Sequence, residues 1–194
     1  MIRTLSTIAV LAAAGTASAQ SLSVLLEIDL SVENQVTFTA TDGVSAETIT
    51  GSSGTGFYLD NSLLGSGSGA FPGSQVGTAD LTSAADASDG TPRLFVATNG
   101  VDTGLNIWNY SDTGDSSFTA GETALSGSAT FSLDAVDYDN FVAEGSSGLI
   151  YFPADDIGDL NDAVVIGRWV IVPAPGAGAL LAMGGLVAVR RRRA

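Results

Sequence analysis

The chain of 194 residues contains no cysteine, no histidine and no lysine. Without cysteine, no disulfide can stabilise the fold, even in an oxidising compartment. Without histidine, the chain lacks the commonest general base and metal ligand, which excludes Ser-His-Asp, Cys-His and ordinary zinc-site chemistry. Stability must therefore come from a hydrophobic core, with bound cations as a second source.

Positive charge is confined to seven arginines, and five of them lie close to the two ends of the chain. Residues 20–171 contain all 21 acidic residues but only Arg93 and Arg168, which is a formal charge of −19. A body this acidic repels phosphate groups, which excludes nucleic-acid binding and disfavours anionic lipid. The simplest interpretation is the solvated acidic surface of an exported protein.

The N-terminal residues have the order of parts found in a secretory signal peptide. Arg3 supplies a positive charge, Ile8 to Ala14 form a short apolar core, and Ala17-Ser18-Ala19 is an A-x-A cleavage pattern. This order predicts that residues 1–19 are removed on export and that Gln20 is the first mature residue.

The C-terminal residues form a second apolar segment, which is short for a membrane span. A span needs about 20 apolar residues to cross a hydrocarbon core about 30 Å thick, and the run from Ala177 to Val189 is shorter and rich in glycine and alanine. Its strongly apolar residues contribute only about −2 to −3 kcal/mol of insertion free energy. We therefore expect a short transmembrane helix that holds the chain temporarily, with the terminal arginines cytoplasmic.

At this end the chain resembles a known class, the PEP-CTERM sorting signals. The resemblance covers residues 172–194, namely the apolar run together with Val172, Pro173, Ala174, Pro175, Gly176, Arg190, Arg191, Arg192 and Arg193. Ala174 stands where the named motif has glutamate. The resemblance implies a Gram-negative bacterium, a membrane protease called exosortase as processing partner, and a link to extracellular polysaccharide, matrix or biofilm. A GlyGly-type sorting tail is an alternative, although Gly184-Gly185 lie inside the apolar run rather than before it.

The body, residues 20–171, has the length of one domain, and its residue pattern predicts mainly strands. Leu22 to Leu30 alternates apolar and polar residues except at Leu25, and residues 36–41 alternate in the same way. Asp42-Gly43 follows and predicts a hairpin with residues 44–50. Further strands are predicted at 56–60, 93–98, 105–110, 129–134, 148–152 and 163–171, and one helical turn at 79–87.

Short strands separated by frequent turns predict an all-β fold, an antiparallel β-sandwich with a jelly roll as one possible arrangement. The last predicted strand runs directly into Pro173, where the tail begins. The predicted organisation is therefore a signal peptide (1–19), an acidic β-sandwich ectodomain (20–171) and a sorting tail (172–194).

Aspartates gather in three turns, around Gly114, at residues 134–140 and around Gly158. Calcium takes six to eight oxygen ligands, commonly from flexible loops. The sequence predicts no required cofactor, but a structural Ca²⁺ ion is one hypothesis, with Asp137, Asp139 and Asp155 as its candidate ligands. The competing interpretation is that aspartate, glycine and asparagine simply form turns.

Aromatic residues raise the alternative of sugar binding. Trp108 and Tyr110 are two residues apart on one predicted strand and so share a face, and Asn106 and Asn109 could bind sugar hydroxyls. Strand aromatics more often pack in a core. A glycosidase would need two carboxyl groups about 5 to 9.5 Å apart across a cleft, and the scattered glutamates favour solvation instead.

Taken together, these patterns predict an exported, non-catalytic protein that passes through a membrane-anchored precursor to the cell surface or the extracellular space. Its matrix role is implied by the resemblance alone. A carbohydrate-binding module is the first alternative, and a carbohydrate-active enzyme is the second.

Overall fold

The computed structural model describes residues 21–61, 69–70, 74–85, 92–97, 104–109, 114–143 and 147–172. The predicted signal peptide, its cleavage site (Ala17, Ala19 and Gln20) and the tail from Pro173 onward lie outside these residues. Within them, strands dominate and the helices are one α-helix and one 3-10 helix, so the predicted all-β class is confirmed. No helix in this part is long and apolar enough to span a membrane.

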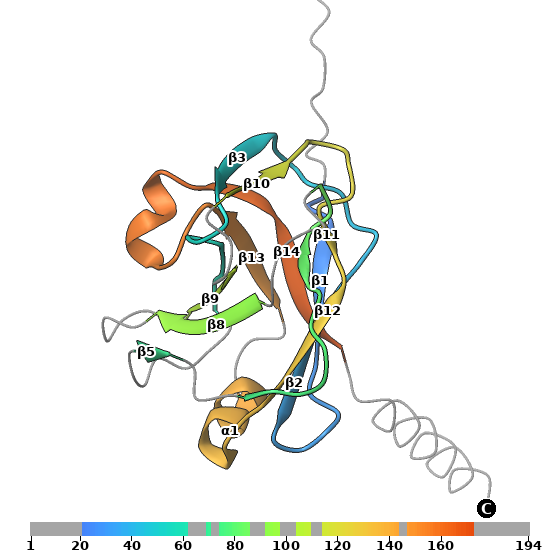
Figure 1. Ribbon diagram of the computed structural model, residues 1–194, viewed down its shortest axis with the longest axis vertical. Coiled ribbons are helices and arrows are strands. Elements are labelled where there is room, and N and C mark those ends of the chain that lie inside the picture. Colours follow the sequence, from blue (N-terminus) through green and yellow to red (C-terminus); the bar gives the residue numbers. More distant parts are fainter. Residues whose placement is uncertain are drawn as a thin grey trace, which may run out of the picture.

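Ten strands form one curled sheet, with the order β5-β8-β9-β4-β13-β14-β1-β2-β12-β6 (Figure 1). Two small sheets, β3-β10 and β7-β11, complete the described strands. The bounds are β1 Val24–Asp29, β2 Gln35–Ala40, β3 Ile49–Ser52, β4 Phe57–Leu59, β5 Gly69–Ala70, β6 Ser74–Gln75, β7 Thr82–Ser83, β8 Pro92–Ala97, β9 Gly104–Asn109, β10 Asp115–Phe118, β11 Leu125–Ser126, β12 Ser128–Ser132, β13 Ser147–Phe152 and β14 Val164–Val172. The helices are α1 Ala135–Ala143 and η1 Ile157–Asn161.

The first and last strands lie side by side near the middle of the large sheet. They pair in parallel, with Leu26 opposite Trp169 and Asp29 opposite Val172. The other strand pairs of this sheet are antiparallel. The prediction of a purely antiparallel sheet is therefore wrong at this pair, because nothing local in two strands so far apart in sequence reveals their relative direction.

A β-bulge explains why Leu25 breaks the alternation of the first strand. The pairing with β14 passes from Val24–Arg168 to Leu26–Trp169, so Leu25 is an additional residue on β1. Leu25 and Leu26 are both fully buried. The side chain of Leu25 occupies the space beside Gly167, where an added Cβ would overlap it.

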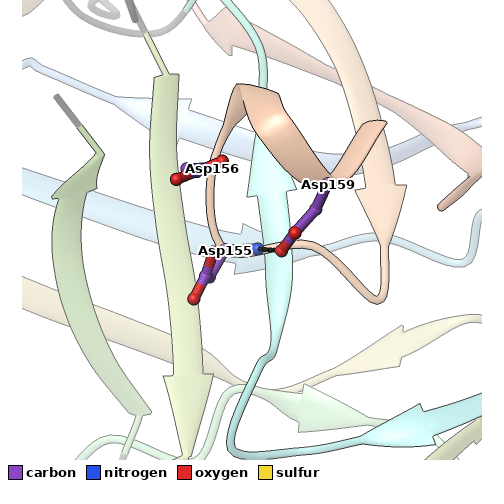
Figure 2. A group of neighbouring side chains, drawn as sticks. All are labelled: Asp155, Asp156 and Asp159. Carbon is purple, nitrogen blue, oxygen red and sulfur yellow. Dashed lines mark hydrogen bonds between the residues drawn. The ribbon is translucent and has the colours of Figure 1, made fainter. Parts of the chain in front are cut away.

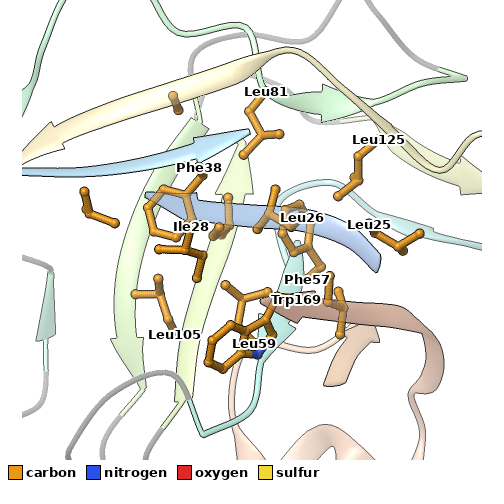
Figure 3. Packing of buried hydrophobic residues seen from close by; sticks show 14 of the residues in the cluster. Leu25, Leu26, Ile28, Phe38, Phe57, Leu59, Leu81, Leu105, Leu125 and Trp169 are labelled. Atoms are coloured by element: carbon orange, nitrogen blue, oxygen red, sulfur yellow. The ribbon is translucent and has the colours of Figure 1, made fainter. Parts of the chain in front are cut away.

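The core is one cluster of buried residues, many of them at alternating positions of the strands (Figure 3). Leu26, Ile28 and Phe38 are fully buried there with Trp169. Phe38 makes edge-to-face contacts with Phe131 of β12 and with Phe141 of α1, with ring centroids 6.2 and 6.4 Å apart. Each edge-to-face pair contributes about 0.5–1.5 kcal/mol beyond the free energy gained by burying the apolar area of its rings.

Two local predictions are wrong. Asp42-Gly43 does not close a hairpin, because β2 pairs with β1 and β12 while β3 pairs with β10. The chain leaves the large sheet at this point and enters a small one, and turn chemistry cannot report that change of partner. The helical turn predicted at 79–87 is, in its described part, a short strand, β7, paired with β11.

Helix α1 was missed because its aspartates were read as turn residues. The Asp134 side chain accepts a hydrogen bond from the backbone N–H of Asp137 at 2.8 Å, which is the bond that an N-cap residue makes. Tyr138 and Phe141, three residues apart, then face the sheet: the Tyr138 hydroxyl donates to the Leu30 carbonyl at 2.7 Å, and Phe141 is fully buried. An N-cap followed by this spacing was the available signal.

Two glycines with positive φ provide a matched test of the packing. Gly56 (φ 72°) is buried, and an added Cβ would overlap the Ile107 carbonyl oxygen, whereas Gly121 (φ 84°) is exposed with nothing within 4 Å. We expect Gly121→Ala to cost about 1–2 kcal/mol of unfolding free energy from backbone strain alone. Gly56→Ala should cost about 1–3 kcal/mol more because backbone must move. Urea denaturation measures both; equal losses would contradict this packing.

Candidate functional site

The most concentrated group of chemically active side chains lies on the loop between β13 and β14. This loop is held against the outer face of the sheet. The Ala154 N–H donates to the Gly56 carbonyl at 3.2 Å, and the Asn106 amide donates to the Ala154 carbonyl at 3.0 Å. Beneath it, Tyr58 packs against Ala154 and Leu160 in a second small core. The loop therefore presents its polar residues from a fixed base.

Three carboxylates converge on this loop: Asp155, Asp156 and Asp159 (Figure 2). One oxygen from each lies within 4.8 Å of the others. Asp155 is exposed, and the other two are half-buried. Among the described residues, this is the one group of three or more acidic side chains that are close enough to share a metal ion.

Two of the three carboxylates also stabilise the loop itself. Asp156 is the N-cap of η1, and its side chain accepts a hydrogen bond from the Gly158 N–H. Asp159 accepts one from the Asp155 N–H at 3.1 Å. These bonds are what turn-forming aspartates make in the absence of any ligand, so they account for the local conformation without a cation.

The proximity of the carboxylates has an electrostatic cost. The pKa of Asp155 is raised above its usual value, first by partial burial and then by its hydrogen bond to Asp159 and the negative charges of Asp159 and Asp156. A divalent cation would relieve this repulsion. Calcium–oxygen distances of about 2.3–2.6 Å allow two ligand oxygens to lie up to about 5 Å apart, so the spacing fits one shared ion.

The sequence-predicted ligands are only partly brought together. Asp155 belongs to the acidic cluster, but Asp137 and Asp139 lie on α1, where Asp137 has Asp134 as its charged neighbour. Burial and the Asp134 charge raise the pKa of Asp137. The candidate cation site therefore moves from a mixed set to three residues of one loop, a grouping that the sequence shows as a run of aspartates around Gly158.

The aromatic candidates are less open to a ligand than the sequence suggests. Trp108 is half-buried and lines a cavity of about 30 Å³, which is room for about one water molecule and not for a sugar ring. Tyr110 lies outside the described residues. Asn106 is only 3% exposed, and its amide donates to the Thr55 and Ala154 carbonyls, so its predicted role as a sugar ligand is wrong.

A second acidic position, Asp60, was not singled out by the sequence. It follows β4, and its side chain accepts a hydrogen bond from the Leu149 N–H, while its carbonyl accepts one from the Trp169 indole at 2.9 Å. Burial raises the pKa of Asp60, and its hydrogen bond opposes that rise. The pKa of Tyr151 is raised too, by burial and by the Asp60 charge. Pairing across β13 creates this arrangement, so no local signal announces it.

Neither the acidic cluster nor the aromatic candidates line the larger surface hollows. One of about 720 Å³ lies where the described chain begins, lined by small and apolar residues without an aromatic ring or a carboxylate: Ser21, Leu22, Ser23, Val44, Ser45, Ala46, Ala120 and Gly121.

Comparison with known protein families, with curated proteins and with solved structures found no match to this chain. The site is thus defined by its own geometry alone.

The calcium hypothesis has a direct test in thermal unfolding. A cation that binds only the folded state raises the melting temperature according to its concentration relative to Kd. If the acidic cluster binds Ca²⁺, millimolar calcium should raise the melting temperature of the wild type and chelator should reverse the rise. Asp155→Asn/Asp159→Asn should abolish the response, whereas the matched pair Asp137→Asn/Asp139→Asn should keep it. Retention of the response in the first double variant, or an unchanged melting temperature in the wild type, would exclude the cluster.

The raised pKa of Asp60 predicts a pH dependence of stability. Because the folded state holds the Asp60 proton more tightly than the unfolded state, this contribution is greatest below pH 3.8 and declines as pH rises through the folded pKa. Asp60→Asn keeps the oxygen that accepts from Leu149 and removes the charge. We therefore expect the stability of the variant, relative to that of the wild type, to increase as the pH is raised from below 3.8 to neutrality. Urea denaturation across this range, with exposed Asp42→Asn as the charge-matched control, measures the difference; parallel curves would contradict the assignment.

Proposed function

We propose that this chain is an exported, non-catalytic surface or extracellular-matrix protein of a Gram-negative bacterium, sorted through a C-terminal PEP-CTERM-like signal. Residues 1–19 are its signal peptide, residues 20–171 its ectodomain, and residues 172–194 its sorting tail. An exosortase-type protease and the membrane are its processing partners, and extracellular polysaccharide is its candidate ligand. The chain requires no cofactor in this proposal, and a structural Ca²⁺ ion on the acidic cluster is an optional part of it.

The observation that carries the proposal is the place where the folded body ends. Strand β14 continues to Val172, the first residue of the tail motif, and is paired with β1 up to that residue. At the other end, β1 starts at Val24, four residues after the proposed mature start at Gln20. Cleavage at both proposed points would therefore release the folded domain with almost nothing added or removed. Two removable sorting signals, one at each end of the chain, require this.

The body itself supports an extracellular, non-catalytic role. Its acidic surface keeps it soluble and away from phosphate polymers. The core is built from aliphatic and aromatic residues, which stabilises a fold that has no disulfides. We interpret the curled sheet and its two small companion sheets as a β-sandwich, the finer architecture within the all-β class.

The two alternatives need features that the described residues supply weakly. A carbohydrate-binding module requires aromatic rings that are open to a sugar, and Trp108 borders a cavity of only about 30 Å³. A glycosidase requires two carboxyl groups facing each other across a cleft. The acidic cluster instead lies on the outer loop, and neither the cavity beside Trp108 nor the hollow of about 720 Å³ has a carboxylate in its lining.

Expression of the full chain in a Gram-negative host, with and without an exosortase, tests the proposal. With the protease, we expect mass spectrometry to find a released body that begins at Gln20 and lacks the apolar run. Without it, the chain should accumulate in the membrane, still cleaved at residue 19. Pro173→Ala/Pro175→Ala should block release, because the motif is altered, whereas Ala174→Glu, which restores the named motif, should preserve or increase it.

Three results would contradict the proposal. One is a chain that keeps its first 19 residues and stays in the cytoplasm. Another is release that is equal with and without the protease. The third is a proline variant that is processed as fast as the wild type. A glycan-binding screen of the released body decides between the matrix role and the first alternative.

A further inference from the structure

We propose that, in the membrane-anchored precursor, the end of the domain formed by the β1–β2 turn and α1 rests on the lipid surface through Val32, Val136 and Val142. This inference rests on the proposed function, because it needs the tail to hold the domain at a membrane. It adds an orientation and a contact surface that the tail alone does not specify.

The topology brings these elements to the end of the sheet at which β14 stops. Val172 pairs with Asp29, and Leu30 then leads into the β1–β2 turn. The Leu30 carbonyl accepts a hydrogen bond from the Tyr138 hydroxyl of α1 at 2.7 Å. Figure 1 shows α1 and this turn together at the lower end of the molecule, where β14 also ends. We call this region the tail end of the domain.

Exposed apolar side chains are concentrated at the tail end. Val136, Val142 and Val32 are 67%, 56% and 54% exposed, more than any other large apolar residue in the described part of the chain. The next are Ile157, Val76 and Val44, at 42%, 41% and 38%. On α1, Val136 and Val142 are six residues apart, which places them about 120° apart around the helix axis, both exposed, while Phe141 is buried against the sheet.

Two of the less exposed residues, Val44 and Ile157, lie at the opposite end of the sheet. Val44 follows Gly43, whose Cα adjoins the carbonyl of Val24 at the start of β1. Ile157 is the first residue of η1, on the loop that leads into β14 at Val164. The three most exposed valines of the described chain therefore lie at the end from which the tail leaves.

The absence of a spacer makes a weak contact sufficient. Because β14 is paired to Val172, the chain passes from the sheet into the tail without intervening residues, and the proposed anchor keeps the tail end at the bilayer surface. The anchor gives the tail end a high effective concentration at the lipid surface. Contact by three valines therefore has only to bias the orientation of the domain and need not supply the affinity for the membrane. The free energy gained by burying these three side chains in the interface scales with their apolar area, as it does for other segments that lie on a membrane surface.

Charge selects the kind of lipid. Asp139 lies between the two helical valines, and Glu33 adjoins Val32; both are exposed. These carboxylates would be repelled by an anionic headgroup layer and tolerated by a zwitterionic one. The proposed occupant is therefore a zwitterionic lipid surface.

The absence of cysteine allows a site-specific test in the full chain. Val142→Cys and Ile157→Cys, each labelled with a polarity-sensitive dye, place one probe at each end of the domain. In phosphatidylcholine vesicles containing brominated lipid, we expect the probe at 142 to be quenched at least about twofold more than the probe at 157, since only an interfacial side chain reaches the acyl boundary. Val32→Ser/Val136→Ser should reduce the quenching at 142, and the matched pair Val44→Ser/Ile157→Ser, at the opposite end of the sheet, should leave it unchanged. Anionic vesicles should weaken it.

The outcomes separate the contact from the anchor. A labelled chain that does not float with vesicles contradicts the proposed anchoring, and the contact with it. A chain that floats but shows equal quenching at 142 and 157 leaves the anchor in place and overturns the contact. A signal at 142 that grows with the protein-to-lipid ratio and is insensitive to bromination identifies a second copy as the occupant, which also overturns it. Circular dichroism of each variant confirms that the fold is retained.

Discussion

Parallel hydrogen bonding between β1 and β14 is the contact on which the rest of the molecule depends. This pair lies in the interior of the ten-stranded sheet, with β13 on one side and β2 on the other. Every further strand of that sheet is attached outward from these four. The bulge at Leu25 and the missing side chain of Gly167 let the two strands approach each other. Leu25, Leu26 and Trp169 are fully buried around this pair. Because the pair joins the first and last strands, the sheet has a high contact order, and its centre cannot form before β14 is available.

The same constraint links the fold to the tail. Strand β14 is paired with β13 up to Val170 and with β1 up to Val172, so releasing its end would expose paired backbone groups. The chain beyond Val172 therefore leaves from a fixed point, next to the β1–β2 turn and α1. In the proposed membrane-anchored precursor, a domain attached in this way would have little freedom to tumble relative to its anchor. That makes the character of the adjoining surface, apolar valines among carboxylates, matter more than it would on a protein with a long stalk.

Burial on both faces of β4 explains where the acidic cluster lies. Phe57 and Leu59 face the main core, while Tyr58 faces outward and needs a cover. The loop after β13 provides it, held by Asn106 and Gly56, and its remaining polar residues are directed to solvent. On this short covering loop, partial burial raises the pKa of Asp155, and its hydrogen bond to Asp159 and the charges of Asp159 and Asp156 raise it further. The arrangement of these three aspartates is at once a consequence of packing and the most suitable place for a cation in the described chain.

Period-two alternation determined much of the fold: most of the longer strands, including β1, β2, β12, β13 and β14, could be placed from it within about two residues. The all-β class followed from the same alternation and from the frequent turns. The acidic surface and the excluded chemistries followed from composition, because charge and reactivity belong to residue types directly. Tertiary structure decided the rest. It alone set the parallel direction of β1 and β14 and the change of sheet after Asp42-Gly43. It also joined Asp155 to Asp156 and Asp159 rather than to Asp137 and Asp139. The strand direction and the change of sheet depend on contacts between residues far apart in sequence, and local pattern carries no record of which distant segment a strand will meet. The helix at residues 135–143 and the grouping of Asp155 with Asp156 and Asp159 did have local signals, in the N-cap at Asp134 and the run of aspartates around Gly158.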